Sequence, residues 1–232
     1  MGGAARFLGL AAGVALIGGG AWFGGRLAIE SVVHDYILDH PEILPQAMDN
    51  LQRRQTSQAL SSVKQSVETP FPGAVLGNPQ GRVTMVEFSD YACGFCRQSL
   101  PDVVALIARN PQLRIVVREL PIISPHSPEA AKMALAAAEQ GKFAAFHDAM
   151  FAAGQVDPSA IAAAAQKAGL DMDRARRVAA TQAVDAEIAR NLDIANRLGF
   201  TGTPSWIVGE RLIAGAVGID QLSEALAAVH SR

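Results

Sequence analysis

A buried strand, a Cys-x-x-Cys pair, a helix and a second strand follow one another between residues 82 and 120, and this order constrains the fold. Apolar residues dominate 82–89 and 113–120, which is typical of strands buried in a sheet. Residues 93–110 between them predict a helix, with Pro101 inside it. Such a β-α-β unit implies a parallel strand pair joined by a right-handed crossover.

The rest of the chain predicts helices first and strands later. Helix starts are indicated at Ser127-Pro128 and Asp157-Pro158, where a capping side chain precedes proline. An apolar stripe over 184–198 predicts a long helix, and 204–208 and 211–214 predict two strands before a helix over 218–230. The fold class is therefore α/β, with a mixed sheet and a helical insertion at about residues 121–199.

Residues 1–29 predict a membrane-anchor helix or an export signal. No charged residue occurs between Arg6 and Arg26, and about 20 apolar residues suffice to cross a bilayer. We favour an uncleaved anchor, because Trp22 and Phe23 stand where a signal peptide needs small residues; a cleaved signal is the alternative. Both interpretations place the body of the chain in the periplasm or on the extracytoplasmic face of the inner membrane.

Residues 30–69 predict a helical arm, which precedes the main domain at 70–232. The arm has one narrow apolar stripe, and such a stripe needs a partner. One interpretation is self-association through residues 31–67, which would give a homo-oligomer. The other is that the arm packs back on its own domain or acts as a stalk.

Cys93 and Cys96 are the two cysteines of the chain. With no third cysteine for a structural bridge, reactivity is the expected reason for their presence. A zinc site is the alternative, but structural zinc takes four protein ligands and the sequence offers no second Cys/His cluster at ligand spacing. We therefore expect no metal and no cofactor.

The placement of the pair favours thiol–disulfide exchange. Cys93 would begin a helix, where free backbone N–H groups and the helix dipole favour a thiolate. Cys96 lies one turn further on, where it can attack a mixed disulfide formed by Cys93 and should be the less exposed of the two. Phe95, held between the cysteines, is expected to be exposed and to contact substrate.

Glu87 is an acid in an otherwise apolar strand. Strand alternation places it on one face with Met85, while Val86 and Phe88 take the other. A buried acid is costly and usually has a task, so we expect Glu87 to exchange a proton with Cys96. An edge acid that reaches solvent is the alternative.

The run Val-Glu-Phe-Ser-Asp-Tyr-Ala-Cys-Gly-Phe-Cys, at 86–96, resembles the active-site segment of the DsbA branch of the thioredoxin fold. Thr203-Pro204 is similar to the cis-proline loop of that family, and the resemblance covers residues 70–232. It implies a thioredoxin-like sheet, a cis bond before Pro204, a buried acid at Glu87, and substrate binding at Thr203 and Pro204. Residues 36–42 of the arm are similar to the N-terminal region of ScsC-type proteins, some of which oligomerise through it.

The expected function is an exported thiol–disulfide oxidoreductase that forms, reduces or isomerises disulfides in cysteine-containing client proteins. Gly-Phe between the cysteines and Thr before Pro204 depart from the DsbA oxidase pattern and favour isomerase or reductase activity. An unidentified membrane protein would be the redox partner. A copper-binding, metal-tolerance protein that uses the dithiol is the alternative, since copper(I) prefers thiolates. The net charge of −2 gives no basis for nucleic-acid binding.

Overall fold

The structure is a computed structural model that describes residue 30 and residues 32–230. It divides into two compact units, residues 1–55 and 56–232. The anchor predicted at 1–29 lies outside the described residues. Within the described part of the chain, no helix combines the length and the apolar character needed to cross a membrane.

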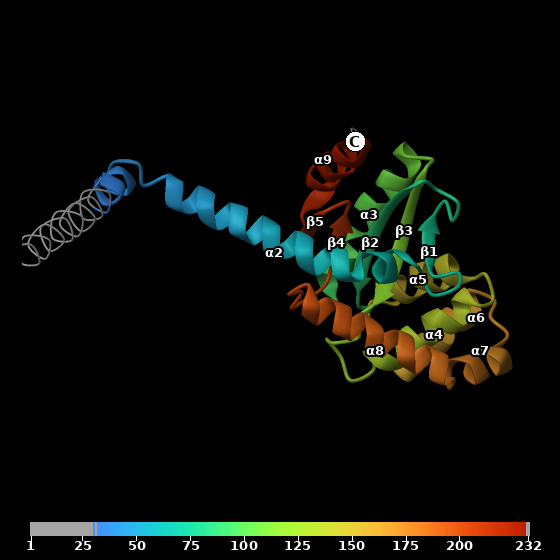
Figure 1. The fold of residues 1–232 in the computed structure, drawn as a ribbon. Coiled ribbons are helices and arrows are strands. Elements are labelled where there is room, and N and C mark those ends of the chain that lie inside the picture. Colours follow the sequence, from blue (N-terminus) through green and yellow to red (C-terminus); the bar gives the residue numbers. More distant parts are fainter. Residues whose placement is uncertain (1–29, 31, 231–232) are drawn as a thin grey trace, which may run out of the picture. The chain divides into compact units, whose positions relative to one another are not determined.

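A five-stranded mixed sheet in the order β1-β3-β2-β4-β5 forms the centre of the second unit (Figure 1). The predicted β-α-β unit is confirmed, because β2 and β3 are parallel and in register from the Val83–Leu113 pair to the Ser89–Glu119 pair. The other strand pairs are antiparallel, and β1 is an edge strand that the sequence analysis missed. The strands are β1 Val75–Gly77, β2 Val83–Ser89, β3 Leu113–Glu119, β4 Ser205–Val208 and β5 Arg211–Ala214.

Helix α3 (Gly94–Arg109) makes the crossover, and five helices form the predicted insertion between β3 and β4. Asp157 caps the second insertion start as expected, accepting from two backbone N–H groups. Helix α4 contacts each of the other four insertion helices, so the insertion packs as one cluster (Figure 1). The insertion helices are α4 Ser127–Ala138, α5 Phe143–Ala153, α6 Pro158–Lys167, α7 Met172–Ala179 and α8 Gln182–Arg197; α9 Gly218–His230 ends the described chain.

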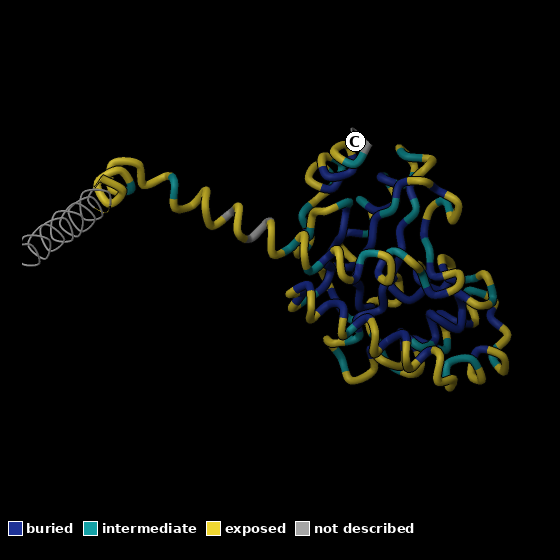
Figure 2. The backbone as a smooth tube through the Cα atoms, in the orientation of Figure 1, coloured by how far each residue is buried: buried dark blue, intermediate teal, exposed yellow. Residues whose placement is uncertain are grey.

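The sheet has an apolar core on each face. Met85 of β2 belongs to the cluster shared with α3, α9 and most of the insertion. Val86 and Phe88 belong to the opposite cluster, together with the end of α2 (Ile43–Glu68) and with α8. Figure 2 shows the inner strands β2, β3 and β4 as mostly buried, whereas the edge strands β1 and β5 are partly exposed. The two-residue alternation predicted for β2 therefore sorts its side chains between two separate cores.

The predicted arm falls into two parts with different surroundings. In the second unit, Leu60, Val63 and Val67 of α2 are buried against the sheet, so this part packs back on its own domain. In the first unit, residues 32–39 are helical and α2 begins at Ile43. Seven large apolar side chains of that unit are each at least half exposed: Val32, Val33, Tyr36, Leu38, Leu44, Met48 and Leu51.

Arg118 of β3 holds the carboxyl end of α2 against the sheet. Its guanidinium is fully buried and donates to the carbonyls of Val67, at 2.8 and 3.0 Å, and of Ser66 and Thr69. It is also paired with the buried carboxylate of Glu187 on α8. One side chain thus satisfies helix-end carbonyls that lack partners within the helix.

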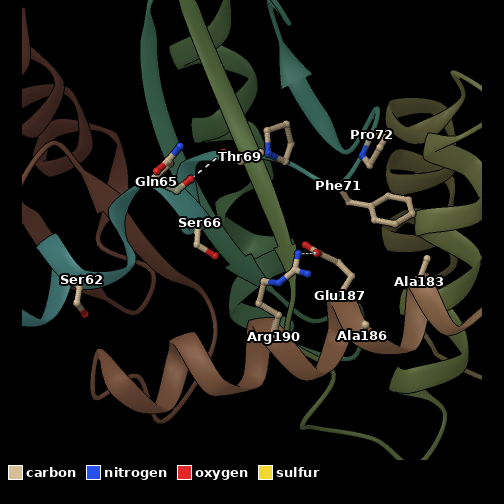
Figure 3. A pocket seen from close by; sticks show the side chains of 11 residues that line it. Ser62, Gln65, Ser66, Thr69, Phe71, Pro72, Ala183, Ala186, Glu187 and Arg190 are labelled. Carbon is tan, nitrogen blue, oxygen red and sulfur yellow. Dashed lines mark hydrogen bonds and ion pairs between the residues drawn. The ribbon is translucent and has the colours of Figure 1, made fainter.

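A pocket of about 570 Å³ lies beside this contact, between the end of α2, the loop at 69–72 and α8 (Figure 3). Glu187 and Arg190 form an ion pair in its wall, with 2.7 Å between Arg190 Nη1 and Glu187 Oε2. The pocket shares no lining residue with the Cys93–Cys96 site. Although this pocket is large, it is separate from the cysteine site.

We predict that Arg118→Met lowers the free energy of unfolding by about 3–5 kcal/mol, because it leaves Glu187 as a buried charge without its buried partner and strips the α2 carbonyls of their donor. Guanidinium denaturation followed by circular dichroism measures the change. Arg190→Met is the matched control: Arg190 pairs with the same carboxylate from a half-exposed position, so its loss should cost less than about 1 kcal/mol. Equal losses in the two variants would contradict the assignment.

Candidate active site

Cys93 stands at the amino-terminal tip of α3, as the sequence predicts. It is the N-cap residue with extended backbone angles, φ −80° and ψ 115°, and Gly94 is the first helical residue. Its backbone N–H donates to the Asp90 carbonyl at 2.9 Å, and its carbonyl accepts from Arg97 N at 3.2 Å. Only 6% of Cys93 is exposed, which is little but more than the 0% of Cys96.

The loop at Thr203-Pro204 faces this sulfur. The Thr203–Pro204 peptide bond is cis, as expected. The Sγ of Cys93 donates to the Thr203 carbonyl oxygen at 3.1 Å. This contact follows from strand register, because β4 pairs with β2 from Phe88–Ser205 onward and the residues before Ser205 therefore lie beyond the end of β2.

Cys96 lies in the first turn of α3 and is completely buried. The prediction that it would be less exposed than Cys93 is confirmed. Both cysteines are unbonded thiols. Burial raises the pKa of the Cys96 thiol far above its usual value, and the charge of Glu87 raises it further. Cys96 therefore holds its proton until a base beside it accepts one.

Glu87 is the acid whose charge acts on the Cys96 thiol. It lies on β2, between β3 and β4, and 1% of it is exposed, so the interpretation as an edge acid is wrong. It shares the face of Met85, as predicted. Burial raises its pKa to about 8, so the carboxyl group is largely protonated at neutral pH. Its Oε2 has no hydrogen-bond partner among the described residues.

Asp90, which the sequence analysis did not single out, fixes the loop that carries Cys93. Its buried carboxylate accepts from the backbone N–H of Ala92 at 2.9 Å and from those of Ile122 and Ile123 at 2.8 Å each. Ser127 Oγ donates to it at 2.7 Å. Ser127, predicted as a helix cap, lies inside α4 and serves Asp90 instead. The sequence signal that could have identified Asp90 is its position, as an acid between the predicted strand and the cysteines.

Three more buried polar side chains meet behind this loop. The hydroxyl of Tyr91 lies 3.1 Å from Glu119 Oε1 and 3.3 Å from His147 Nδ1. Burial raises the pKa of Glu119 and lowers that of His147 to about 4, so His147 is neutral at pH 7. The sequence analysis missed this group because its members come from a loop, a strand and an insertion helix that only the fold brings together.

Exposed apolar side chains occur in the first turn of α3 and on the loop that Asp90 binds. Phe95 is 63% exposed, as predicted, and the loop bound by Asp90 carries Ile122 and Ile123, which are 43% and 52% exposed. Trp206, in contrast, is fully buried in the core. In the described part of the chain, no three His, Cys, Asp or Glu residues are grouped so as to hold a metal ion.

Two family models match the chain. The DSBA-like thioredoxin domain matches residues 84–227, and the copper resistance protein ScsC N-terminal domain matches residues 26–58. Among curated proteins, the Na(+)/H(+) antiporter NhaA 3 of Salinispora tropica is 35% identical over 155 residues, which are 66% of this chain and 24% of that protein. The chain thus spans about a quarter of the length of the curated relatives it matches.

Solved structures resemble the chain over most of its length. A thioredoxin-like oxidoreductase from Silicibacter pomeroyi is 40% identical, with a TM-score of 0.64 over 68% of this chain and 92% of that one. The thiol-disulfide exchange protein alpha-DsbA2 from Wolbachia pipientis is 26% identical, with a TM-score of 0.69 over 77% and 98%. A Proteus mirabilis ScsC variant, 22% identical, shares the fold with a TM-score of 0.71 over 88% and 93%. With residues 84–227 matched by the family model and its two cysteines at the start of α3, this chain belongs to the DSBA-like thioredoxin domain family, and its residues 26–58 are similar to the ScsC N-terminal domain.

Proposed function

We propose that this protein is an exported thiol–disulfide oxidoreductase that acts on cysteine-containing client proteins through Cys93 and Cys96. The observation that carries the proposal is the position of the Cys93 sulfur, at a helix tip and 3.1 Å from the Thr203 carbonyl, with Cys96 buried one turn behind it. Sodium–proton exchange is not carried over from the antiporter relatives, of which the chain matches only a part.

The reaction would proceed in two sulfur transfers. The Cys93 thiolate attacks a client disulfide, forming a Cys93–client bond and releasing the client's other sulfur as a thiol. Cys96 then loses its proton to Glu87 and attacks Cys93, which forms the Cys93–Cys96 disulfide and frees the client thiol. In reverse, the protein disulfide oxidises a client dithiol. The unidentified membrane protein would restore the starting redox state.

Client binding would use the surroundings of Cys93. The backbone at Thr203 and Pro204 would pair with the extended client chain beside its cysteine. Phe95, Ile122 and Ile123 offer exposed apolar contacts next to it. A client segment with apolar residues near its cysteine fits this surface, because its binding would remove apolar area from water.

Copper(I) binding by the two thiols is the second candidate. The name of the family model that matches residues 26–58, copper resistance protein ScsC N-terminal domain, supports considering it. A tight one-to-one copper complex without insulin-reduction activity would reverse the ranking of the two candidates.

We predict that Cys93→Ser abolishes insulin reduction in the presence of dithiothreitol, because no sulfur remains for the first attack. Cys96→Ser should also be inactive, but it should trap clients in stable mixed disulfides, since the resolving sulfur is missing. Non-reducing gel electrophoresis separates the two outcomes. Client adducts on Cys93→Ser, or their absence from Cys96→Ser, would overturn the assigned roles. The reduction potential then gives the direction, with about −120 mV for an oxidase and about −200 mV for disulfide shuffling.

We predict that Glu87→Gln slows the attack by Cys96 on the mixed disulfide on the order of 100-fold, because the amide cannot accept the thiol proton. In the wild type this step should accelerate as the pH rises through about 8, where Glu87 becomes a carboxylate, and the variant should lose that inflection. Rapid acid quenching measures the rate from about pH 6 to about pH 9, a range that includes the Glu87 pKa of about 8. Glu139→Gln, at an exposed site, should keep both the rate and the inflection.

Stability provides a second readout for Glu87→Gln. The folded-state pKa of about 8 exceeds the ordinary 4.5, so the unfolded chain releases this proton at lower pH. Glu87 therefore lowers wild-type stability progressively between pH 4.5 and 8, by at most about 1.4 kcal/mol per pH unit. The variant lacks this loss, and its stability advantage over the wild type should widen as the pH rises across that window. A constant difference would contradict the buried-acid assignment.

We propose that the first unit associates with a second copy of the chain. Leu44, Met48 and Leu51 recur at helical spacing and are at least half exposed. We predict that the double variant Leu44→Lys, Met48→Lys lowers the native mass to that of one chain and leaves glutathione exchange at Cys93 unchanged. Gln46→Lys, exposed on the same helix, is the control and should keep the wild-type mass. A wild-type chain that is already monomeric would refute the proposal.

A further inference from the structure

Glu87 has no visible exit for the proton it accepts. The carboxyl group is buried on β2, the middle strand between β3 and β4, near Cys96, and its Oε2 lacks a partner in the described structure. Each turnover nevertheless moves one proton between Cys96 and solvent. A buried proton carrier needs a hydrogen-bonded path to water, and unpartnered buried polar atoms indicate where such a path has gaps for water.

Ser89 and Glu119 extend from Glu87 on the same face of the sheet. Ser89 lies two residues along β2, and the register places it directly opposite Glu119 on β3. The Ser89 hydroxyl is buried and, within the described residues, also lacks a hydrogen-bond partner. It is nevertheless close enough to Glu87 and to Cys96 to lower the pKa of each of these groups.

The path continues through hydrogen bonds already present in the structure. Glu119 Oε1 is 3.1 Å from the Tyr91 hydroxyl, which is 3.3 Å from His147 Nδ1. His147 is 1% exposed, and its Nε2 is a further buried atom without a partner in the described chain. Carboxyl, phenol and imidazole can each accept a proton on one side and donate one on the other.

A cavity of about 150 Å³ meets the path at His147. It lies between α3, α5 and the end of β1, with apolar walls from residues such as Leu100 and Val103. Asp148, the neighbour of His147 on α5, is exposed and lines the same cavity. His147 and Asp148 give water the polar partners that an otherwise apolar cavity lacks.

From this geometry we infer that Ser89, Glu119, Tyr91 and His147 form a proton path that joins Glu87 to the water-accessible cavity beside Asp148. The inference rests on the proposed function and names the positioning residues that serve Glu87. The other titratable groups facing the path are Cys96 on α3 and Asp90 ahead of it.

In the proposed transfer, water bridges the gaps on either side of Ser89, and the Tyr91 hydroxyl turns from donating to Glu119 to accepting from it. Glu87 gives its proton through one such water to the Ser89 oxygen, and the Ser89 proton moves through another to Glu119. Glu119 then donates to the Tyr91 oxygen, the Tyr91 proton moves to His147 Nδ1, and the proton on Nε2 leaves to cavity water. Each intermediate residue gains one proton and loses one, so the net change is Glu87 deprotonated and one proton in solvent. Reduction of the protein disulfide uses the reverse sequence.

The experiment uses the full reduced chain and oxidised glutathione as the probe. Attack by Cys93 releases a first glutathione thiol, and attack by Cys96 releases the second while its proton enters the path. Rapid acid quenching resolves the two releases. We expect Tyr91→Phe and His147→Ala to slow only the second release, at least about tenfold, and to leave the equilibrium constant with glutathione unchanged. A path for protons alters the rate but not the end points.

Chemical rescue separates proton transfer from a structural role. Imidazole is expected to restore the second release in His147→Ala, where it can enter through the adjoining cavity, whereas a bulky buffer of similar pKa is not. Phe151→Leu is the control, because Phe151 packs against the rings of both Tyr91 and His147 and carries no proton. It should loosen the same packing without slowing the second release.

The outcomes distinguish the path from the proposed function. A normal second release in Tyr91→Phe would show that the proton leaves by another route and would overturn the path, with the redox function intact. Slowing by Phe151→Leu equal to that of Tyr91→Phe would also overturn it. If the wild type releases no glutathione at all, the proposed function itself fails. Should His147→Ala not fold, Tyr91→Phe alone decides.

Discussion

The carboxyl groups of Glu87, Asp90 and Glu119 are all buried, and a buried charge costs free energy unless hydrogen bonds replace its water. Asp90 has four donors, which compensate its charge and make it an anchor for the cysteine loop. Glu87 has an unpartnered oxygen and a pKa of about 8. A carboxyl group is therefore structural at Asp90 and suited to proton exchange at Glu87. The number of hydrogen-bond donors around each group accounts for the difference.

This division explains how a completely buried thiol can react. In the proposed reaction, the complete burial of Cys96 would confine the first exchange with a client to Cys93. The burial that confers this selectivity also raises the pKa of Cys96 and would make it inert without a base. As the proposed base, Glu87 would resolve the conflict, because the burial that disfavours the Cys96 thiolate also brings the pKa of the acid to about 8.

Local pattern was sufficient to predict the parts of the site that lie near each other in sequence. The alternation around Glu87 predicted its face, and the strand-to-helix transition predicted Cys93 at the helix tip. The contact between Cys93 and Thr203 was predictable only through family resemblance, since it depends on how β4 pairs with β2. Nothing local to His147 or Glu119 indicates that they share Tyr91. The edge strand β1 was missed because three residues are too few for a periodic signal.

Strand β3 contributes to both the attachment of α2 and the group of buried acids. Successive side chains of a strand point to opposite faces, so Arg118 and Glu119 emerge on opposite sides of the sheet. Arg118 reaches the carbonyls at the end of α2, whereas Glu119 reaches Tyr91 behind the cysteine loop. A slip of β3 by one residue would turn Arg118 toward the face that now holds Glu119 and Tyr91, and would leave the helix end without its donor. The register of β3 against β2 therefore maintains both the attachment of α2 and the contact of Glu119 with Tyr91 behind the cysteine loop.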